Sequence, residues 1–502
     1  MTKLLELYRR YNQFGIYKDF VPVDNQYTII NLYREMKNKE IDINVWLEKH
    51  WANNIKTAIE CKQGLSYDNE LIQPKSIFLR IHLLNIVANA IPQSAYNRME
   101  ISANIIVDMT MAIALYYFGL QTYMFYEIPI TDTQKKNIIR NQNFYIELAD
   151  IKMVRGNTSE KELDKYLKLF AKDIYDIDRN KNIGLFLDNG NIFIICIEDF
   201  VDYILFETER IFKGYASEKE YDLYVSEKGT EFERMVVDIS NIFFDEVYHT
   251  LFYYPNSKQE MEIDALIKSS EHLAILECKS GTFNIEGINE DSAIELKIKN
   301  KSQKAYKTLK NVSKYLAENE LYSFKYMDQI VSGRCNSPVC LHISMYSMDF
   351  ISSNLHALFP DYLNANPIFT ISIEHFFAML LEAKKTGKDI FSYWEIRKKD
   401  VEDYPGIYFD NNELDLYYEL TQVNDNLLFP EFKKQGFLEH LNTHGHVFFS
   451  FHNQYGHEVR PAQEMIRQLD TYLLLGIFEK GKSWFGINKR YLKNLEEYLR
   501  IV

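Results

Sequence analysis

The stretch "EMEIDALIKSSEHLAILECKSG", residues 260–281, constrains the fold most, because apolar and polar residues alternate through much of it. Alternation with a period of two is typical of β-strands, so we predict strands at 261–267 and 273–279. If residues 269–272 form the loop, every opposed pair on one face is apolar: Ile263–Cys278, Ala265–Leu276 and Ile267–Ala274. A slip of one residue would mix the two faces, so the pattern predicts this register.

The same register sets Asp264 directly opposite Glu277 on the other face. Two carboxylates about 4 Å apart repel by roughly 4 kcal/mol at an effective dielectric near 20, and a divalent cation would reverse that sign. Such oxygen ligands suit Mg²⁺ or Mn²⁺. Lys279 lies two residues beyond Glu277 on the same face, where it could hold a phosphate oxygen or orient and deprotonate a water. An exposed sheet face on which Glu262 neutralises Lys279 would give the same spacing.

Two helices and a further strand flank this predicted hairpin. The segment 230–244 carries an apolar stripe at Phe232, Met235, Val236, Ile239 and Phe243. The segment 297–316 carries a second stripe at Ala305, Leu309, Val312 and Leu316. A strand at 339–346 could close the sheet. The order of helix, hairpin, helix and strand predicts an α/β core of roughly 120 residues.

A chain of 502 residues exceeds what one hydrophobic core normally supports, so we expect several domains. Residues 1–215 are predicted to be a helical to mixed α/β region with a regulatory or oligomerising role. The polar stretch 213–229 marks a boundary, and residues 216–350 form the central α/β domain. Residues 351–502 are predicted to be an α+β region, in which a helix at "PAQEMIRQL" and a following hairpin suggest a winged-helix-like element.

Composition predicts a globular protein of the reducing cytoplasm. The chain has five scattered cysteines, and its first twenty residues are amphipathic and mixed in charge rather than a secretory leader. The apolar run 109–120 is too short to span a bilayer and is expected to be a buried helix. A net charge of −14 argues against a protein coated in nucleic acid, although a local basic groove stays compatible with it.

The pattern EID-x12-ECK resembles the active-site motif of the PD-(D/E)XK nuclease superfamily over about residues 230–345. Asp264 matches the first acid, Glu277 the second and Lys279 the lysine, whereas Ile263 stands where many members have proline. The resemblance implies a restriction-endonuclease-like mixed sheet flanked by helices. It also implies a glutamate on the preceding helix, which is Glu233 or its rival Glu231. The backbone carbonyl of Cys278 would be a further metal ligand beside Asp264, Glu277 and Glu233.

A lysine-rich helix follows the candidate site. Seven lysines and no acid lie between residues 297 and 314. A solvated helix face is the usual meaning of such a run. In an acidic protein the same run could neutralise phosphates, and binding would then depend strongly on salt. The nucleic-acid contacts that we predict are Lys297, Lys301, Lys304 and Lys307, with Gln303 toward the lysine side.

Three other patterns compete for a function. The segment "GIFEKGKS", 476–483, matches a phosphate-binding loop literally, but few residues follow it and a hairpin turning at Lys480–Lys482 suits it better. Five histidines crowd residues 440–457 and could seat Zn²⁺, although a strand with polar ends explains them as well. Cys335, Cys340 and His342 lack an obvious fourth ligand, which favours free cysteines.

These patterns together favour a Mg²⁺- or Mn²⁺-dependent nuclease, an endonuclease rather than an exonuclease, acting on DNA in preference to RNA. Large unassigned flanks suggest host defence against foreign DNA, with self-association or a defence-system partner subunit and no membrane contact. The alternative is a catalytically inactive nuclease-fold protein that binds nucleic acid or serves in assembly.

Overall fold

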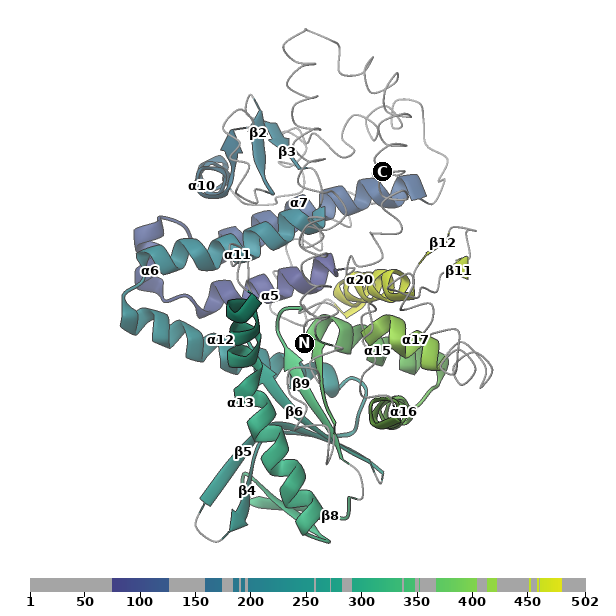
Figure 1. Cartoon of the computed structure of the whole chain (residues 1–502). Coiled ribbons are helices and arrows are strands. Elements are labelled where there is room, and N and C mark those ends of the chain that lie inside the picture. Colours follow the sequence, from purple (N-terminus) through teal and green to yellow (C-terminus); the bar gives the residue numbers. More distant parts are fainter. Residues whose placement is uncertain are drawn as a thin grey trace. The chain divides into compact units, whose positions relative to one another are not determined.

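The computed structural model describes residues 75–125, 159–173, 184–188, 191–194, 197–256, 259–270, 272–281, 291–335, 338–347, 352, 367–403, 413–421, 451–452, 458–459 and 461–480. The chain divides into two compact units, one of Tyr11–Glu227 with Asp470–Val502 and one of Lys228–Leu469 with Met1–Arg10. Helices α12 (Glu218–Ser240) and α20 (Pro461–Lys480) each run through this division (Figure 1). In the part of the chain described, no helix is long and apolar enough to cross a membrane.

Helices dominate the described part of the unit that contains Tyr11–Glu227. They are α5 (Ile77–Ala90), α6 (Gln93–Met99), α7 (Ala103–Phe125), α10 (Glu160–Phe170) and α11 (Ile197–Tyr215). A small sheet contains β1 (Lys172–Asp173), β2 (Phe186–Asp188) and β3 (Asn191–Phe193). Helix α5 packs against α7 and α11. The apolar run 109–120 is helical within α7, and its residues 109–114 are buried, as predicted.

The first turn of α5 is capped by an aspartate from the far end of the chain. Asp470 of α20 accepts hydrogen bonds from the Ser76 hydroxyl at 2.6 Å, from the Ile77 amide at 3.2 Å and from the Phe78 amide at 3.0 Å. The first amides of a helix have no partner inside it, and negative charge is favourable there. A buried carboxylate therefore completes a helix that begins almost four hundred residues earlier.

The unit that contains Lys228–Leu469 is built on a seven-stranded mixed sheet. Its strands are β4 (Glu246–Asn256), β5 (Gln259–Ser269), β6 (His272–Lys279), β7 (Tyr322–Tyr326), β8 (Gln329–Gly333), β9 (Val339–Ser344) and β10 (Ile368–Ser372). The spatial order is β10–β9–β6–β5–β4–β7–β8. The strands β10, β9 and β6 are parallel, and every other neighbouring pair is antiparallel. The protein is thus mixed α/β with helices beside an open mixed sheet, in agreement with the predicted class.

Helices cover both faces of the parallel part of this sheet. Tyr306 of α13 (Asp291–Glu318) contacts Thr370 of β10, whereas the preceding strand residue, Phe369, packs its ring against Trp394 of α16 (Ile390–Asp403). Successive strand residues point to opposite faces, so α13 and α16 lie on opposite sides. Figure 1 shows α13 lying across the sheet. The remaining elements are α15 (Ile373–Thr386), α17 (Glu413–Thr421), β11 (Phe451–His452) and β12 (Glu458–Val459).

The predicted helices of the core are present, with corrections to their limits. The stripes of α12 and α13 are buried as expected from Phe232 to Ile239 and from Ala305 to Leu316, but α12 ends at Ser240, so Phe243 lies beyond the helix and is half-buried. Helix α12 starts at Glu218, however, so most of the polar stretch 213–229 is helical rather than interrupted, while the division between the two units does fall within it, after Glu227. Most charged residues of this stretch are exposed, although Lys228 is buried, and this exposure explains the polar composition that we interpreted as a boundary. Strand β10 and helices α15 to α17, which we assigned to the C-terminal region, lie in the unit of the sheet.

The hairpin predicted at the C-terminal end is wrong. Residues 471–480 continue α20, so the first arm of the hairpin expected around Lys480–Lys482 is helical. The same helix excludes the strand that a phosphate-binding loop at 476–483 would follow. The apolar run "TYLLL" suits a buried helix and a buried strand equally, which is why its periodicity misled. Residues 481–483 lie outside the described part.

Candidate functional site

The hairpin of β5 and β6 brings the predicted acids together where its ladder ends. Paired residues run from Ser269–His272 to Ala265–Leu276, which is the predicted register. The next expected pair, Asp264 with Glu277, does not continue the ladder. Instead, the Cys278 amide donates a 2.6 Å hydrogen bond to Oδ2 of Asp264. Two carboxylates that face each other repel. The Cys278 amide therefore gives Asp264 a hydrogen-bond donor, where the predicted register would have set Glu277 opposite it.

The neighbouring strand is distorted at the same level. Thr250 of β4 lies between His249 and Leu251, which both pair with β5, and its φ is 56°. This left-handed conformation is costly for a β-branched residue and must be held by its surroundings. Because His249 pairs with Ala265 and Leu251 with Ile263, Thr250 lies opposite Asp264. Backbone strain of this kind concentrates at functional sites, and here it coincides with the first predicted acid.

The ammonium of Lys279 lies among three oxygens. Its Nζ is 2.5 Å from Oε1 of Glu277, 2.9 Å from the carbonyl oxygen of Cys278 and 3.6 Å from Oδ2 of Asp264. Burial alone would lower the pKa of Lys279, but the negative charges of Asp264 and Glu277 outweigh burial and raise that pKa. The lysine therefore stays charged. These oxygens belong to three of the four residues predicted to hold a metal.

Glu277 is the most enclosed acid of this group. Its side chain is 5% exposed, whereas that of Asp264 is 13% exposed. Burial, and then the negative charge of Asp264, raise the pKa of Glu277 to about 7, although Lys279 opposes the shift. A single ammonium thus leaves excess negative charge at the site. Burial also raises the pKa of the Cys278 thiol, so this cysteine contributes through its backbone rather than its sulfur.

The helix acid beside the hairpin is Glu233. Burial, and then the negative charge of Asp264, raise the pKa of Glu233 to about 7. Its rival, Glu231, has 39% of its side chain exposed and forms a 2.6 Å ion pair with Arg234 at the surface. The structure therefore brings Glu233 to the site and leaves Glu231 on the surface. His249 Nε2 lies 3.9 Å from Glu233 Oε2, a neighbour that nothing in the sequence spacing indicated.

The donor set at this site fits a hard divalent cation. Two carboxylates and a backbone carbonyl are oxygen ligands of the type that Mg²⁺ and Mn²⁺ prefer. Burial is the main cause of the raised pKa values of Glu277 and Glu233, and the negative charge of Asp264 adds to it, while Lys279 and Lys304 act in the opposite direction. Among the described residues, no three His, Cys, Asp or Glu side chains already surround a common point. Here one donor belongs to the backbone, and the ammonium occupies the place between the oxygens.

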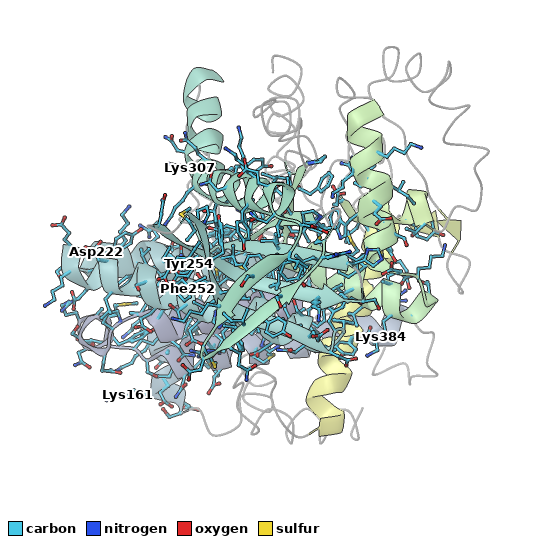
Figure 2. The ribbon with its side chains drawn as sticks, turned by 90° about the horizontal axis from the view of Figure 1, so that it is seen from below. Lys161, Asp222, Phe252, Tyr254, Lys307 and Lys384 are labelled. Carbon is cyan, nitrogen blue, oxygen red and sulfur yellow. The ribbon has the colours of Figure 1, made fainter. Side chains whose placement is uncertain are left out.

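The lysine-rich helix α13 presents part of its charge to solvent. Gln303, Lys304 and Lys307 are exposed, as are Lys310 and Lys314. Figure 2 labels Lys307 on this helix. The positive charge of Lys304 lowers the pKa of both Glu233 and Glu277, so its electrostatic influence reaches the acids. The side chains of Lys297 and Lys301 lie outside the described part.

The other predicted ligands do not form a described centre. Cys335 and Cys340 are not joined in a disulfide, and burial raises the pKa of Cys340 to about 12. Their neighbour His342 points its Nδ1 at the Thr370 hydroxyl, 3.0 Å away, rather than at a sulfur. His440, His444, His446 and His457 lie outside the described residues. His452 belongs to β11, and its side chain is likewise not described.

Comparisons with protein-family models, with curated proteins and with solved structures found no match to this chain. A functional proposal therefore depends on the chemistry of the residues around Lys279 and on the order of the elements that carry them.

Proposed function

We propose that this chain is a metal-dependent nuclease of the PD-(D/E)XK type, with DNA favoured over RNA as its substrate. The observation that carries the proposal is the position of Lys279 Nζ among oxygens of Asp264, Glu277 and Cys278. A cation has a place there, and the acids retain enough charge to favour a divalent one. An exposed, salt-bridged sheet face would not bury Glu277.

The order of elements supports the same proposal. Helix α12, the antiparallel strands β4, β5 and β6, helix α13 and the parallel strand β9 follow one another, with the β7–β8 hairpin inserted before β9. The resemblance implies a mixed sheet flanked by helices with the acids on its central hairpin. Glu233 on α12, Asp264 on β5 and Glu277 on β6 lie on the elements that it requires.

The residues divide the chemical work as follows. A divalent cation held by Asp264, Glu277, Glu233 and the Cys278 carbonyl would polarise a phosphodiester and supply a water of lowered pKa. Lys279, once released from Glu277, can hold a phosphate oxygen or orient that water. The exposed lysines of α13 neutralise backbone phosphates on either side of the scissile bond.

Plasmid DNA, linear duplex DNA and single-stranded RNA test the proposal. We expect the full chain to cleave DNA with Mg²⁺ or Mn²⁺ and not with EDTA. Asp264→Ala and Lys279→Ala should each lower the cleavage rate by at least about 100-fold, because each removes a group that acts on the reacting atoms. Lys325→Ala, an exposed lysine of β7, is the matched control and should cleave at the wild-type rate.

The protein could instead be folded and bind nucleic acid but cleave no substrate with any metal. That result would favour the alternative, a catalytically inactive nuclease-fold protein that serves in binding or assembly. Cleavage that survives in both site variants would place the chemistry elsewhere in the chain.

A further inference from the structure

One row of side chains crosses the three parallel strands beneath α13. Thr370 of β10 pairs with His342 of β9, and His342 pairs in turn with Glu277 of β6. Residues paired across neighbouring strands share a face, so these three side chains point to the side that α13 covers. Each of them is less than 5% exposed. The row therefore leads from a buried hydroxyl, through an imidazole, to an acid of the proposed active site.

The first half of this row fixes the imidazole. His342 Nδ1 lies 3.0 Å from Thr370 Oγ1, which lies 3.1 Å from the hydroxyl of Tyr306. The Tyr306 hydroxyl is closer to Thr370 than to the Ile368 carbonyl at 3.4 Å, so we assign Tyr306 as the donor to Thr370. The Thr370 hydroxyl then donates to Nδ1 of His342. Nδ1 then accepts, and Nε2 carries the proton. Burial, and then the positive charge of Lys279, lower the pKa of His342 to about 3, which keeps the ring neutral.

The second half of the row lacks a protein contact. Nε2 of His342 is buried and has no hydrogen-bond partner among the described residues. A buried donor without a partner destabilises the fold, so such groups usually have a role. The two ring nitrogens point in roughly opposite directions. With Nδ1 turned toward β10, Nε2 turns toward β6, where Glu277 and Lys279 lie.

We propose that His342 is a positioning residue for the metal site, whose Nε2–H holds the Glu277 carboxylate directly or through one water. This inference rests on the proposed function, because Glu277 needs orienting only if its oxygens bind a cation. While Lys279 bonds Oε1 of Glu277, the ammonium orients the carboxylate. When a divalent cation takes that place, the imidazole provides the fixed donor. Groups that hold a metal-binding side chain in this way typically contribute 10- to 100-fold in metal affinity.

Two substitutions at position 342 separate a positioning role from a structural one. Asparagine places its amide near Nδ1 and can keep the Thr370 contact, whereas glutamine reaches the position of Nε2. We expect His342→Asn to weaken Mn²⁺ binding at least about tenfold by calorimetric titration of the full chain. His342→Gln should stay within about threefold of wild type. Cleavage rates at subsaturating Mn²⁺ should follow the same order and converge when Mn²⁺ saturates.

The reverse order, with glutamine weaker than asparagine, would overturn the inference and assign His342 to the Thr370 contact alone. Equal affinity in both variants and wild type would overturn it as well. Thr370→Val, which removes the anchoring hydroxyl with little change of shape, covers the case in which His342→Asn does not fold. In the wild-type background, Thr370→Val should weaken Mn²⁺ binding. In the His342→Gln background, the same substitution should have no further effect. A Thr370→Val variant that binds Mn²⁺ with wild-type affinity contradicts the proposal. Wild-type protein that binds no Mn²⁺ overturns the proposed function itself.

Discussion

At the scale of single residues, the site is defined by a charge imbalance. Asp264 and Glu277 lie beside Lys279, and the charge of Lys279 also lowers the pKa of Glu233, so one ammonium faces three acids. Burial and mutual repulsion raise the pKa of two of these acids to about 7. A structural ion-pair cluster would be expected to balance its charges, because unpaired buried charge destabilises the fold. The imbalance indicates a site that is suited to an additional cation.

The raised pKa of Glu277 predicts how stability depends on pH without metal. Its ordinary pKa is 4.5 and its folded value about 7, so the folded state binds more protons between these limits. The contribution of this group to the unfolding free energy should therefore be greatest below about pH 4.5 and fall as the pH rises to 7. Between pH 5 and pH 8, the unfolding free energy of Glu277→Gln should therefore fall by about 1–3 kcal/mol less than that of wild type. Urea unfolding in EDTA measures this difference.

Asp328→Asn, which removes an exposed acid outside the site, serves as the control and should retain the wild-type pH dependence. An unchanged slope in Glu277→Gln would mean that this carboxylate is ionised without penalty.

The position of Lys279 predicts that its ammonium competes with a metal. Its Nζ lies among oxygens of three predicted ligands, so a cation must displace it. We expect Lys279→Met to bind Mn²⁺ about tenfold more tightly than wild type while losing cleavage, because the competitor and the phosphate-binding group are removed together. Titration calorimetry measures the first effect. Equal or weaker Mn²⁺ binding in the variant would show that the ammonium and the metal occupy different positions.

At the scale of elements, helix α13 both packs on the sheet and exposes lysines beside the site. Replacing Lys304, Lys307 and Lys310 by glutamine in an Asp264→Asn background should weaken binding to duplex DNA. The slope of log affinity against log salt should become shallower by roughly three, about one for each phosphate that the helix no longer neutralises. Fluorescence anisotropy in EDTA over a salt series measures that slope.

The matched control is the replacement of Lys384, Lys385 and Lys388 by glutamine on and just after α15, a second exposed lysine group of the same unit. Figure 2 labels Lys384. Equal slopes for both triple variants would indicate binding to total charge rather than to a track along α13.

The sequence could predict those features that depend on the spacing of residues within one segment. The register of β5 and β6 follows from the alternation around Ala265 and Leu276, and the buried stripes of α12 and α13 follow from helical spacing. Strand β4 escaped because its pattern is irregular and includes the left-handed Thr250. The ladder of β5 and β6 ends before Asp264 and Glu277, where Asp264 accepts from the Cys278 amide, and a period of two does not encode that contact. The role of His342 needed neighbours on two parallel strands, and pairing of that kind is not visible in one segment.

At the scale of the whole molecule, Asp470 ties the C-terminal helix to the start of α5. Its carboxylate accepts three hydrogen bonds there, two of them from amides that have no partner within the helix. We expect Asp470→Ala to lower the unfolding free energy by about 2 kcal/mol, because these buried donors lose their acceptor. Thermal and urea unfolding of the full chain measure the loss.

Asp389→Ala removes the exposed carboxylate that accepts from the first amides of α16, and it should cost less because water can replace that contact. Similar losses for the two variants would show that the burial of Asp470 adds nothing to its capping.

The lysine at the centre of the acids also affects how the protein is made. Because the chain carries its own counter-charge, a newly synthesised molecule can reach its final architecture before any divalent ion arrives. On the function proposed above, the ion would then alter reactivity rather than shape. Such a protein would persist in a dormant form when metal is scarce and would become competent when the supply returns.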